Sequence, residues 1–134
     1  MAIKIENRLF QIETEHTSYQ MKVDKYGVLT HLWYGAKTEC SMDYLLDYPD
    51  VGFSGNIYEA ENYSLNTLPQ EYSTSGVGDF RIPAITVTHD DGSRALDLRY
   101  SGHKISRGKY NIDGLPAVYA TEEEAETLEI VMED

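Results

Sequence analysis

Apolar and polar residues alternate with a period of two along much of this chain, whereas the spacing of an amphipathic helix hardly occurs. In residues 19–24 every second residue is apolar, which places the apolar side chains on one face of a strand. The same alternation recurs in residues 85–89, 95–100 and 128–132. With strands of about five or six residues, this spacing predicts roughly eight or more strands.

Clusters of turn-forming residues separate the alternating segments. The clearest are residues 24–27, 90–93, 106–109 and 113–114. Many short strands joined by such turns are typical of a β-sandwich. A chain of 134 residues is long enough for one domain that buries about two-thirds of its unfolded surface. We therefore predict an all-β fold, a large antiparallel β-sandwich formed by residues 1–134 as one domain.

Two segments do not follow the strand pattern. Residues 38–66 form a long polar and aromatic connection, and connections of this length inside a compact domain are usually functional or disordered. Residues 121–126 are mostly glutamate, and Thr121 and Glu124 have the spacing of a capping box. That spacing allows a single helical turn, while the density of acids favours a solvated loop.

The charge of the chain limits its partners, because 23 acidic residues outnumber 11 basic ones and give a formal net charge of −12. Such a surface repels phosphate groups, so we expect no binding of nucleic acid or of a membrane. No apolar run approaches the roughly 20 residues that span a bilayer. The N-terminus lacks the apolar region of a signal peptide, and Cys40 is the single cysteine. These features favour a cytoplasmic protein.

The sequence shows no metal site and no nucleophile motif. Its histidines lie far apart and in no ligand spacing; they are His16, His31, His89 and His103. Residues 52–55 are one residue short of a nucleophile elbow. The sequence also lacks a phosphate loop and a dinucleotide fingerprint, so we expect no metal and no cofactor.

The densest run of turn formers, aromatics and charged residues lies between Leu68 and Ala84. Two glycines flank one residue in 76–78 and two prolines bracket the run, so the backbone is expected to follow an irregular path. Asp79 and Arg81 flank an aromatic residue, and side chains two positions apart in a strand point the same way. The pair forms either a surface ion pair in a structural turn or a fixed polar clamp.

This run, Leu68-Pro69-Gln70-Glu71-Tyr72 followed by Gly76 to Ala84, resembles a signature of the N-terminal domain of family 36 glycoside hydrolases. These enzymes are α-galactosidases that cut terminal α-linked galactose from raffinose- and melibiose-type sugars. Further blocks match the family in the same order: residues 27–37, 97–100, 103–105, 108–109, 114–117 and 125–134. The resemblance therefore covers almost the whole chain.

The resemblance implies a sandwich of the kind often called a supersandwich, packed beside a (β/α)₈ barrel. The two catalytic aspartates of these retaining enzymes lie in the barrel, and the sequence stops at Asp134, before the barrel begins. We therefore expect an N-terminal domain of a larger α-galactosidase, with no catalytic residue and no hydrolysis by this chain alone. The expected partners are the protein's own barrel, α-galactoside sugars and further copies of the protein, because many bacterial members form tetramers.

In such tetramers a loop of this domain reaches the active site of a neighbouring subunit, and the 38–66 connection is our candidate for that loop. Within it, residues 50–56 best match the reaching segment. Asp50 is predicted to accept hydrogen bonds from sugar hydroxyls, and Phe53 to offer a ring face or to anchor the loop. The alternative role of Asp50 is to cap a turn after Pro49.

We favour a structural role for Asp79 and Arg81, as a clamp at the interface with the barrel, over direct contact with substrate. Trp33 and Tyr34 sit on opposite faces of one predicted strand. We expect one of the two to pack in the core, and the other to be exposed in this chain but covered in the full enzyme. Trp33 is counted with Asp79 and Arg81 among the interface residues.

Two other functions fit the composition. Eleven tyrosines and one tryptophan could supply stacking platforms for sugars, as in a free-standing carbohydrate-binding β-sandwich module. Aromatic residues in strands are chiefly packing residues, however, and no flat aromatic triad follows from their spacing. The second alternative is a purely structural or oligomerisation domain, which would self-associate without binding sugar.

Overall fold

The computed structural model describes residues 2–49, 55–116 and 119–134, and contains two antiparallel sheets. The larger sheet holds four strands in sequence order, β1 (Ala2–Glu6), β2 (Leu9–Glu13), β3 (Thr17–Val23) and β4 (Leu29–Ala36). The smaller sheet pairs β5 (Arg99–Arg107) with β6 (Glu126–Glu133). One short 3₁₀ turn, η1 (Asp43–Leu45), is the only helical element in the described part of the chain.

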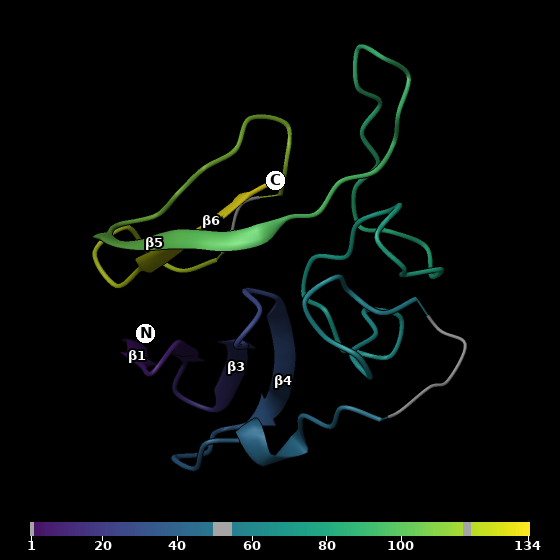
Figure 1. Cartoon of the computed structure of the whole chain (residues 1–134). Coiled ribbons are helices and arrows are strands. Elements are labelled where there is room, and N and C mark those ends of the chain that lie inside the picture. Colours follow the sequence, from purple (N-terminus) through teal and green to yellow (C-terminus); the bar gives the residue numbers. More distant parts are fainter. Residues whose placement is uncertain (1, 50–54, 117–118) are drawn as a thin grey trace.

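The two sheets pack face to face, with the β5–β6 pair over the four-stranded sheet (Figure 1). The core between them is built on Phe10, Met21, Val23 and Leu29, which project from β2, β3 and β4. Alternate side chains of β5 and β6 close it from the other side; they are Tyr100, Leu128, Ile130 and Met132. The predicted all-β antiparallel sandwich is thereby confirmed.

The number of strands is smaller than the sequence pattern predicted, with six strands among the described residues instead of roughly eight. Residues 85–89 alternate but are not a strand, and β5 begins only at Arg99. Alternation places side chains on two faces, but a strand also needs a hydrogen-bonded neighbour. Within the described chain, the backbone hydrogen bonds of this region close a local turn instead, from His89 N to the Ser93 carbonyl and from Gly92 N to the His89 carbonyl.

The 38–66 connection carries a small core of its own. Ile57, Tyr63 and Leu65 are buried against Val28 and Leu68, beside the turn that precedes β4. The turn itself contains Gly27 at φ +82°, a backbone conformation that suits glycine. The described parts of the connection are therefore packed against the sandwich and hydrogen-bonded to it.

The acidic segment at residues 121–126 folds into one hydrogen-bonded turn. The Glu124 and Ala125 amides donate to the Thr121 carbonyl, and the Thr121 hydroxyl donates to the Glu124 carboxylate at 2.7 Å. The segment is a single non-helical turn in which the two side chains bond to each other, and the acids from 122 to 124 stay exposed to solvent, as expected for an acidic loop.

Candidate functional site

Asp79 and Arg81 form a bidentate ion pair at the centre of the predicted signature run. The Arg81 Nε donates to Asp79 Oδ1 at 2.9 Å, and Nη2 donates to Oδ2 at 2.7 Å. The Arg81 backbone amide donates to Asp79 Oδ1 as well, at 3.0 Å. Two parallel bonds between guanidinium and carboxylate fix the relative orientation of both groups. Of the two arrangements that the sequence allowed, the structure shows the fixed clamp.

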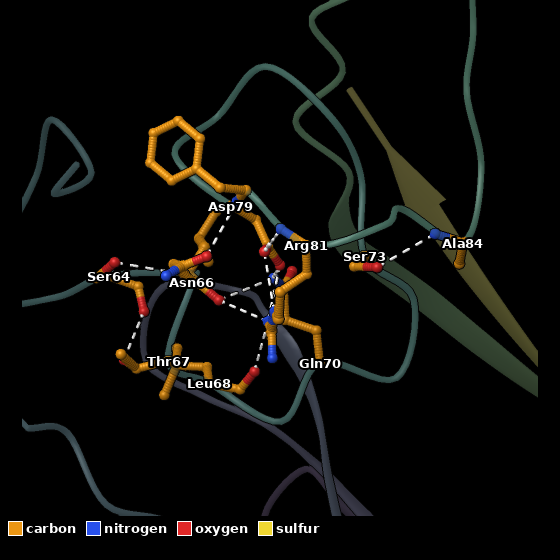
Figure 2. Close-up of polar contacts among 11 residues, drawn as sticks. Ser64, Asn66, Thr67, Leu68, Gln70, Ser73, Asp79, Arg81 and Ala84 are labelled. Atoms are coloured by element: carbon orange, nitrogen blue, oxygen red, sulfur yellow. Dashed lines mark hydrogen bonds and ion pairs between the residues drawn. The ribbon is translucent and has the colours of Figure 1, made fainter. Parts of the chain in front are cut away.

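The clamp fastens the 79–81 segment to the end of the long connection. The Arg81 Nη2 also donates to the Leu65 and Leu68 carbonyls, both at 2.8 Å. Gln70 Nε2 donates to Asp79 Oδ2 at 2.6 Å, and Phe80 N donates to the Asn66 side-chain oxygen at 3.0 Å. Figure 2 shows these contacts around Asp79 and Arg81. One guanidinium group therefore joins the backbone of residues 65–68 to the 79–81 segment.

The two partners of the clamp differ in their exposure to solvent. The Asp79 side chain is 1% exposed and the Arg81 side chain 44%. Burial by itself raises the pKa of Asp79, but the hydrogen bonds and positive charge of Arg81, with a bond from Gln70, outweigh it and hold that pKa below its usual value. Asp79 is thus held as a buried carboxylate whose charge is balanced by a single cation.

The backbone around the clamp is irregular, as the prolines and glycines of the run predicted. The expectation that Asp79 and Arg81 lie in a strand was wrong. Residues 79–81 are not a strand, and Gly76 and Gly78 precede them at φ +88° and +92°. Asp79 and Arg81 face each other because of their mutual bonds. The residues between and after them point outward, with Phe80 81% and Ile82 95% exposed.

The predicted substrate residues, Asp50 and Phe53, lie outside the described residues. The structure does describe the chain on both sides, up to Pro49 and again from Gly55. Both flanks belong to segments that are hydrogen-bonded to the sandwich or packed against it.

The prediction for Trp33 and Tyr34 was wrong in one respect, since neither side chain is in the core. Trp33 is half-buried on the outer face of β4, with its Nε1 donating to the Ala36 carbonyl at 3.3 Å. Tyr34 is exposed at the other face, where its ring contacts Tyr19. A register shift between β3 and β4 puts Trp33 opposite Gln20 and His31 opposite Met21. Leu32, between His31 and Trp33 in the sequence, is buried, whereas Trp33 and Tyr34 are not.

Sequence reasoning missed a polar cluster at the open edge of the core. Glu71 accepts hydrogen bonds from the Tyr19 hydroxyl at 2.6 Å, and its carboxylate lies 2.7 Å from His31 Nδ1. Burial and the Glu71 carboxylate both raise the pKa of Tyr19. The cluster borders a groove of about 490 Å³, otherwise lined mainly by apolar side chains: Met21, Leu29, Leu98, Ile130 and Met132. Glu71 lies 52 positions from Tyr19 and 40 positions from His31, so no local sequence motif predicts the cluster.

A second cluster joins the turn before β4 to the long connection. Asp24 accepts bonds from the Tyr26 and Val28 amides, at 2.8 and 3.0 Å, and from the Tyr63 hydroxyl. The Tyr48 ring stacks on the Tyr63 ring at 5.7 Å. Burial, followed by the charge and hydrogen bond of Asp24, raises the pKa of Tyr48 to about 12. Tyr48 and Tyr63 thus help to fix the connection to the sandwich.

These clusters carry no arrangement suited to metal-assisted catalysis. Across the described ranges, no three His, Cys, Asp or Glu side chains gather in a way that could hold a metal ion. None of the helical structure described in these ranges is both long and apolar enough to traverse a bilayer. In the clamp, the Asp79 carboxylate accepts bonds from Arg81 and Gln70, and the Arg81 guanidinium also donates to two backbone carbonyls.

Comparison with known proteins identifies close relatives of this arrangement. Residues 27–134 match the family model "Glycosyl hydrolase family 36 N-terminal domain". The bifunctional alpha-galactosidase/sucrose kinase AgaSK of Mediterraneibacter gnavus is 51% identical over 130 residues, which cover 95% of this chain and 14% of that protein.

Solved structures share the fold as well as the sequence. The galactosidase domain of AgaSK superimposes with a TM-score of 0.93 at 49% identity, over 99% of this chain and 19% of that one. A family 36 α-galactosidase variant, AgaA from Geobacillus stearothermophilus, was solved in complex with raffinose. It superimposes with a TM-score of 0.83 at 39% identity, over 92% of this chain and 18% of its own. The chain thus spans less than a fifth of the length of these relatives.

Proposed function

Because this chain belongs to the family of glycosyl hydrolase family 36 N-terminal domains, we propose that it is the non-catalytic N-terminal domain of a retaining α-galactosidase. The observation that carries the proposal is the match along nearly the whole chain to proteins whose names state that activity. The bond-breaking carboxylates are proposed to lie in a barrel domain of the same polypeptide. The substrates are proposed to be terminal α-galactosides of the melibiose and raffinose type, since the AgaA relative binds raffinose.

The proposed role of the domain is to complete the substrate site of a neighbouring subunit in a homo-oligomer, with a tetramer as the expected assembly. Asp50 accepts hydrogen bonds from sugar hydroxyls in this proposal, and Phe53 supplies a ring face or anchors the loop. The support is the length of the 38–66 connection and the firm attachment of its described parts to the sandwich. Long packed loops of this kind commonly carry function.

The second proposed role is contact with the barrel through the outer side of the clamp. Asp79 and Arg81 hold the backbone so that Phe80 and Ile82 are presented to solvent. Two large apolar side chains held outward by an ion pair with a buried carboxylate are suited to an interface within a larger protein. Trp33, half-buried on the outer face of β4, is proposed to belong to the same kind of contact.

The proposal places the protein in the cytoplasm. Its cysteine, Cys40, is free and exposed, which suits a reducing compartment.

The first test uses the 134-residue chain alone, which is expected not to hydrolyse a p-nitrophenyl α-galactoside. Titration with galactose, melibiose and raffinose in a calorimeter is expected to show no binding. Measurable binding by the chain alone would support the free-standing sugar-binding module instead. Specific turnover by pure material would refute the non-catalytic assignment.

The second test replaces Asp50 with asparagine in the complete polypeptide that carries this domain. Loss of a charge-assisted hydrogen bond is expected to raise KM for raffinose by about tenfold or more and to leave kcat nearly unchanged. Asp47→Asn is the matched control, because Asp47 is exposed and its Oδ1 accepts the neighbouring Tyr48 amide, a bond that asparagine keeps. An unchanged KM in Asp50→Asn, with light scattering still showing the oligomer, contradicts the proposed role.

A further inference from the structure

Ahead of β5, residues 82–95 form a long loop that projects away from both sheets (green in Figure 1). Its first half contains residues 84–88, Ala-Ile-Thr-Val-Thr, which we call the 84–88 segment. Four of these five residues are β-branched, the residue type that favours strands. Ile85 and Val87 are half-buried, whereas Thr86 and Thr88 are exposed. The segment therefore has the composition and the two different faces of a strand.

The 84–88 segment nevertheless lacks the hydrogen bonds of a strand. It is held at its start, where the Ala84 amide donates to the Ser73 carbonyl at 2.9 Å. Beyond that point, the backbone amides and carbonyls of residues 85–88 have no hydrogen-bond partner within the described chain. One edge of a strand-forming segment is thus left open.

The second half of the loop does not supply the missing partner, because its own backbone groups are bound elsewhere. The Leu96 amide donates to the Ser75 carbonyl at 3.0 Å, and the Arg94 carbonyl accepts the Ser75 hydroxyl at 2.8 Å. Farther out, the Ala95 carbonyl lies 2.9 Å from Nε2 of the His89 ring. The two halves of the loop therefore do not pair with each other as the strands of a hairpin would.

An open edge of this composition is a hazard for a soluble protein. Proteins ordinarily protect an edge strand with a charged residue, a proline or a bulge, because an unprotected edge pairs with other chains and aggregates. The 84–88 segment contains no charged residue and no proline. Short, uncharged, β-branched segments are also the ones most prone to aggregate when they stay unpaired. These features indicate that the edge is covered in the complete protein.

The size of the segment favours a partner in the same polypeptide over a second copy of the protein. Five residues of strand are about 17 Å long. One pair of strands of that length buries far less than the roughly 1,200 Å² of a stable interface between separate molecules. A partner in the same polypeptide needs no such area, because the covalent connection supplies a high effective concentration.

The lengths of the relatives show that such a polypeptide has ample chain to provide the partner. The residues matched here are 14% of the AgaSK protein and 18% of the AgaA chain. Phe80 and Ile82, the proposed contact with the rest of the polypeptide, also lie immediately before the 84–88 segment and are exposed. An interface at Phe80 and Ile82 would therefore continue directly into the open edge.

We propose that residues 84–88 are an edge strand that pairs with a β-strand of the same polypeptide outside these 134 residues. The partner strand carries apolar side chains on the face of Ile85 and Val87 and polar ones beside Thr86 and Thr88, because side chains directly opposite each other are in contact. The inference rests on the proposed function only for the existence of the longer polypeptide. It does not require the domain to contact sugar.

Hydrogen exchange in the complete polypeptide, resolved by mass spectrometry to residues 85–88, tests the pairing. Amides that donate to a partner strand are expected to exchange at least about 100-fold more slowly than in an unstructured chain. Asp90 is the internal reference, because it is exposed in the turn of the same loop and its amide donates to no group in the described chain. Exchange throughout residues 85–88 as fast as that of Asp90 would overturn the inference.

Proline substitutions provide the matched variants. Thr86→Pro and Val87→Pro each remove one backbone donor, and successive amides of a strand face opposite edges. At least one of the two is therefore expected to reduce the protection of the neighbouring amides about tenfold or more. Asp90→Pro is the control, since it places proline in the same loop at the second position of the His89–Gly92 turn, where proline is favoured. Equal protection in all three variants would contradict the pairing.

Two further measurements distinguish the partner and the function. Protection that is unchanged by dilution supports a partner in the same polypeptide, whereas protection that disappears when light scattering shows monomers identifies a second copy and overturns the inference. Raffinose hydrolysis by the same preparation tests the proposed function separately. An active enzyme with unprotected residues 85–88 refutes the inference alone. Protected residues in a long polypeptide without this activity refute the proposed function alone.

Discussion

Replacing Phe10 with alanine is expected to lower the free energy of unfolding of this chain by about 3–5 kcal/mol. Phe10 is 0% exposed and lies where the two sheets meet. Its ring centroid is 5.9 Å from that of Tyr100 and 5.2 Å from that of His103, both on β5. Its removal leaves a cavity between the sheets that rigid strands on both sides cannot close.

Urea unfolding followed by the fluorescence of Trp33, the single tryptophan, measures this change. Phe80→Ala removes the same atoms from a side chain that is largely in solvent, and is expected to change the unfolding free energy by less than about 0.5 kcal/mol. Equal effects of the two substitutions would show that Phe10 is not at the centre of the core.

Replacing Arg81 with methionine is expected to cost about 3 kcal/mol, because it leaves the Asp79 carboxylate buried without its cation. The partial exposure of Arg81 keeps the figure at the lower end of the range for buried pairs. Arg94→Met is the control, since Arg94 is exposed. The double variant Asp79→Asn, Arg81→Met is expected to be more stable than Arg81→Met alone, because no uncompensated charge remains.

The same pair has a pH signature. The pKa of Asp79 is lowered in the folded chain, so its contribution to stability is complete above the unfolded value of about 3.9 and is lost as the pH falls through the folded value. In Arg81→Met the guanidinium bonds and charge that lower this pKa are lost, while the amide of residue 81 and Gln70 still donate to the carboxylate, so the folded pKa of Asp79 lies above its value in the unsubstituted chain. The stability difference between the two proteins is therefore expected to narrow below about pH 4, in urea unfolding at stepwise lower pH. A constant difference across that range would argue against a charged Asp79.

The sequence pattern predicted those strands whose alternation coincides with pairing. Residues 19–23 and 128–132 alternate, and both lie in strands with neighbours. Residues 85–89 alternate equally well, yet no strand pairs with them in the described chain. Alternation reports two different faces, and only the tertiary fold decides whether a neighbouring backbone is present.

Side-chain contacts over long sequence distances were the least predictable part of the site. Asp79 and Arg81 were predicted to pair because side chains two apart in a strand point the same way, but they pair in a segment that is not a strand. Gln20 lies on the polar face of the strand predicted at residues 19–24, and its burial depends on a segment twenty or more positions later. The residue type does not predict that another segment covers it, because polar residues on an outer strand face are ordinarily solvated.

The two-residue repeat of Ser18, Gln20 and Lys22 restricts how the length of this chain can vary in evolution. Removing or adding one residue within β3 would turn Gln20 toward the apolar core and Met21 toward the outer face, where Gln20 bonds to the backbone of Cys40 and Met42, and would disrupt both surfaces at once. A single insertion between Thr38 and Asp43, whose amide and carboxylate bond to Ser18 and Lys22, would shift these groups away from their partners. After Asp43, the remaining residues of η1 are exposed and have no such regular series of contacts with the sheet among the described residues. Diversification of loop length among homologues is therefore expected to begin after Asp43, leaving the attachment to the sheet unchanged while the reach of the loop varies.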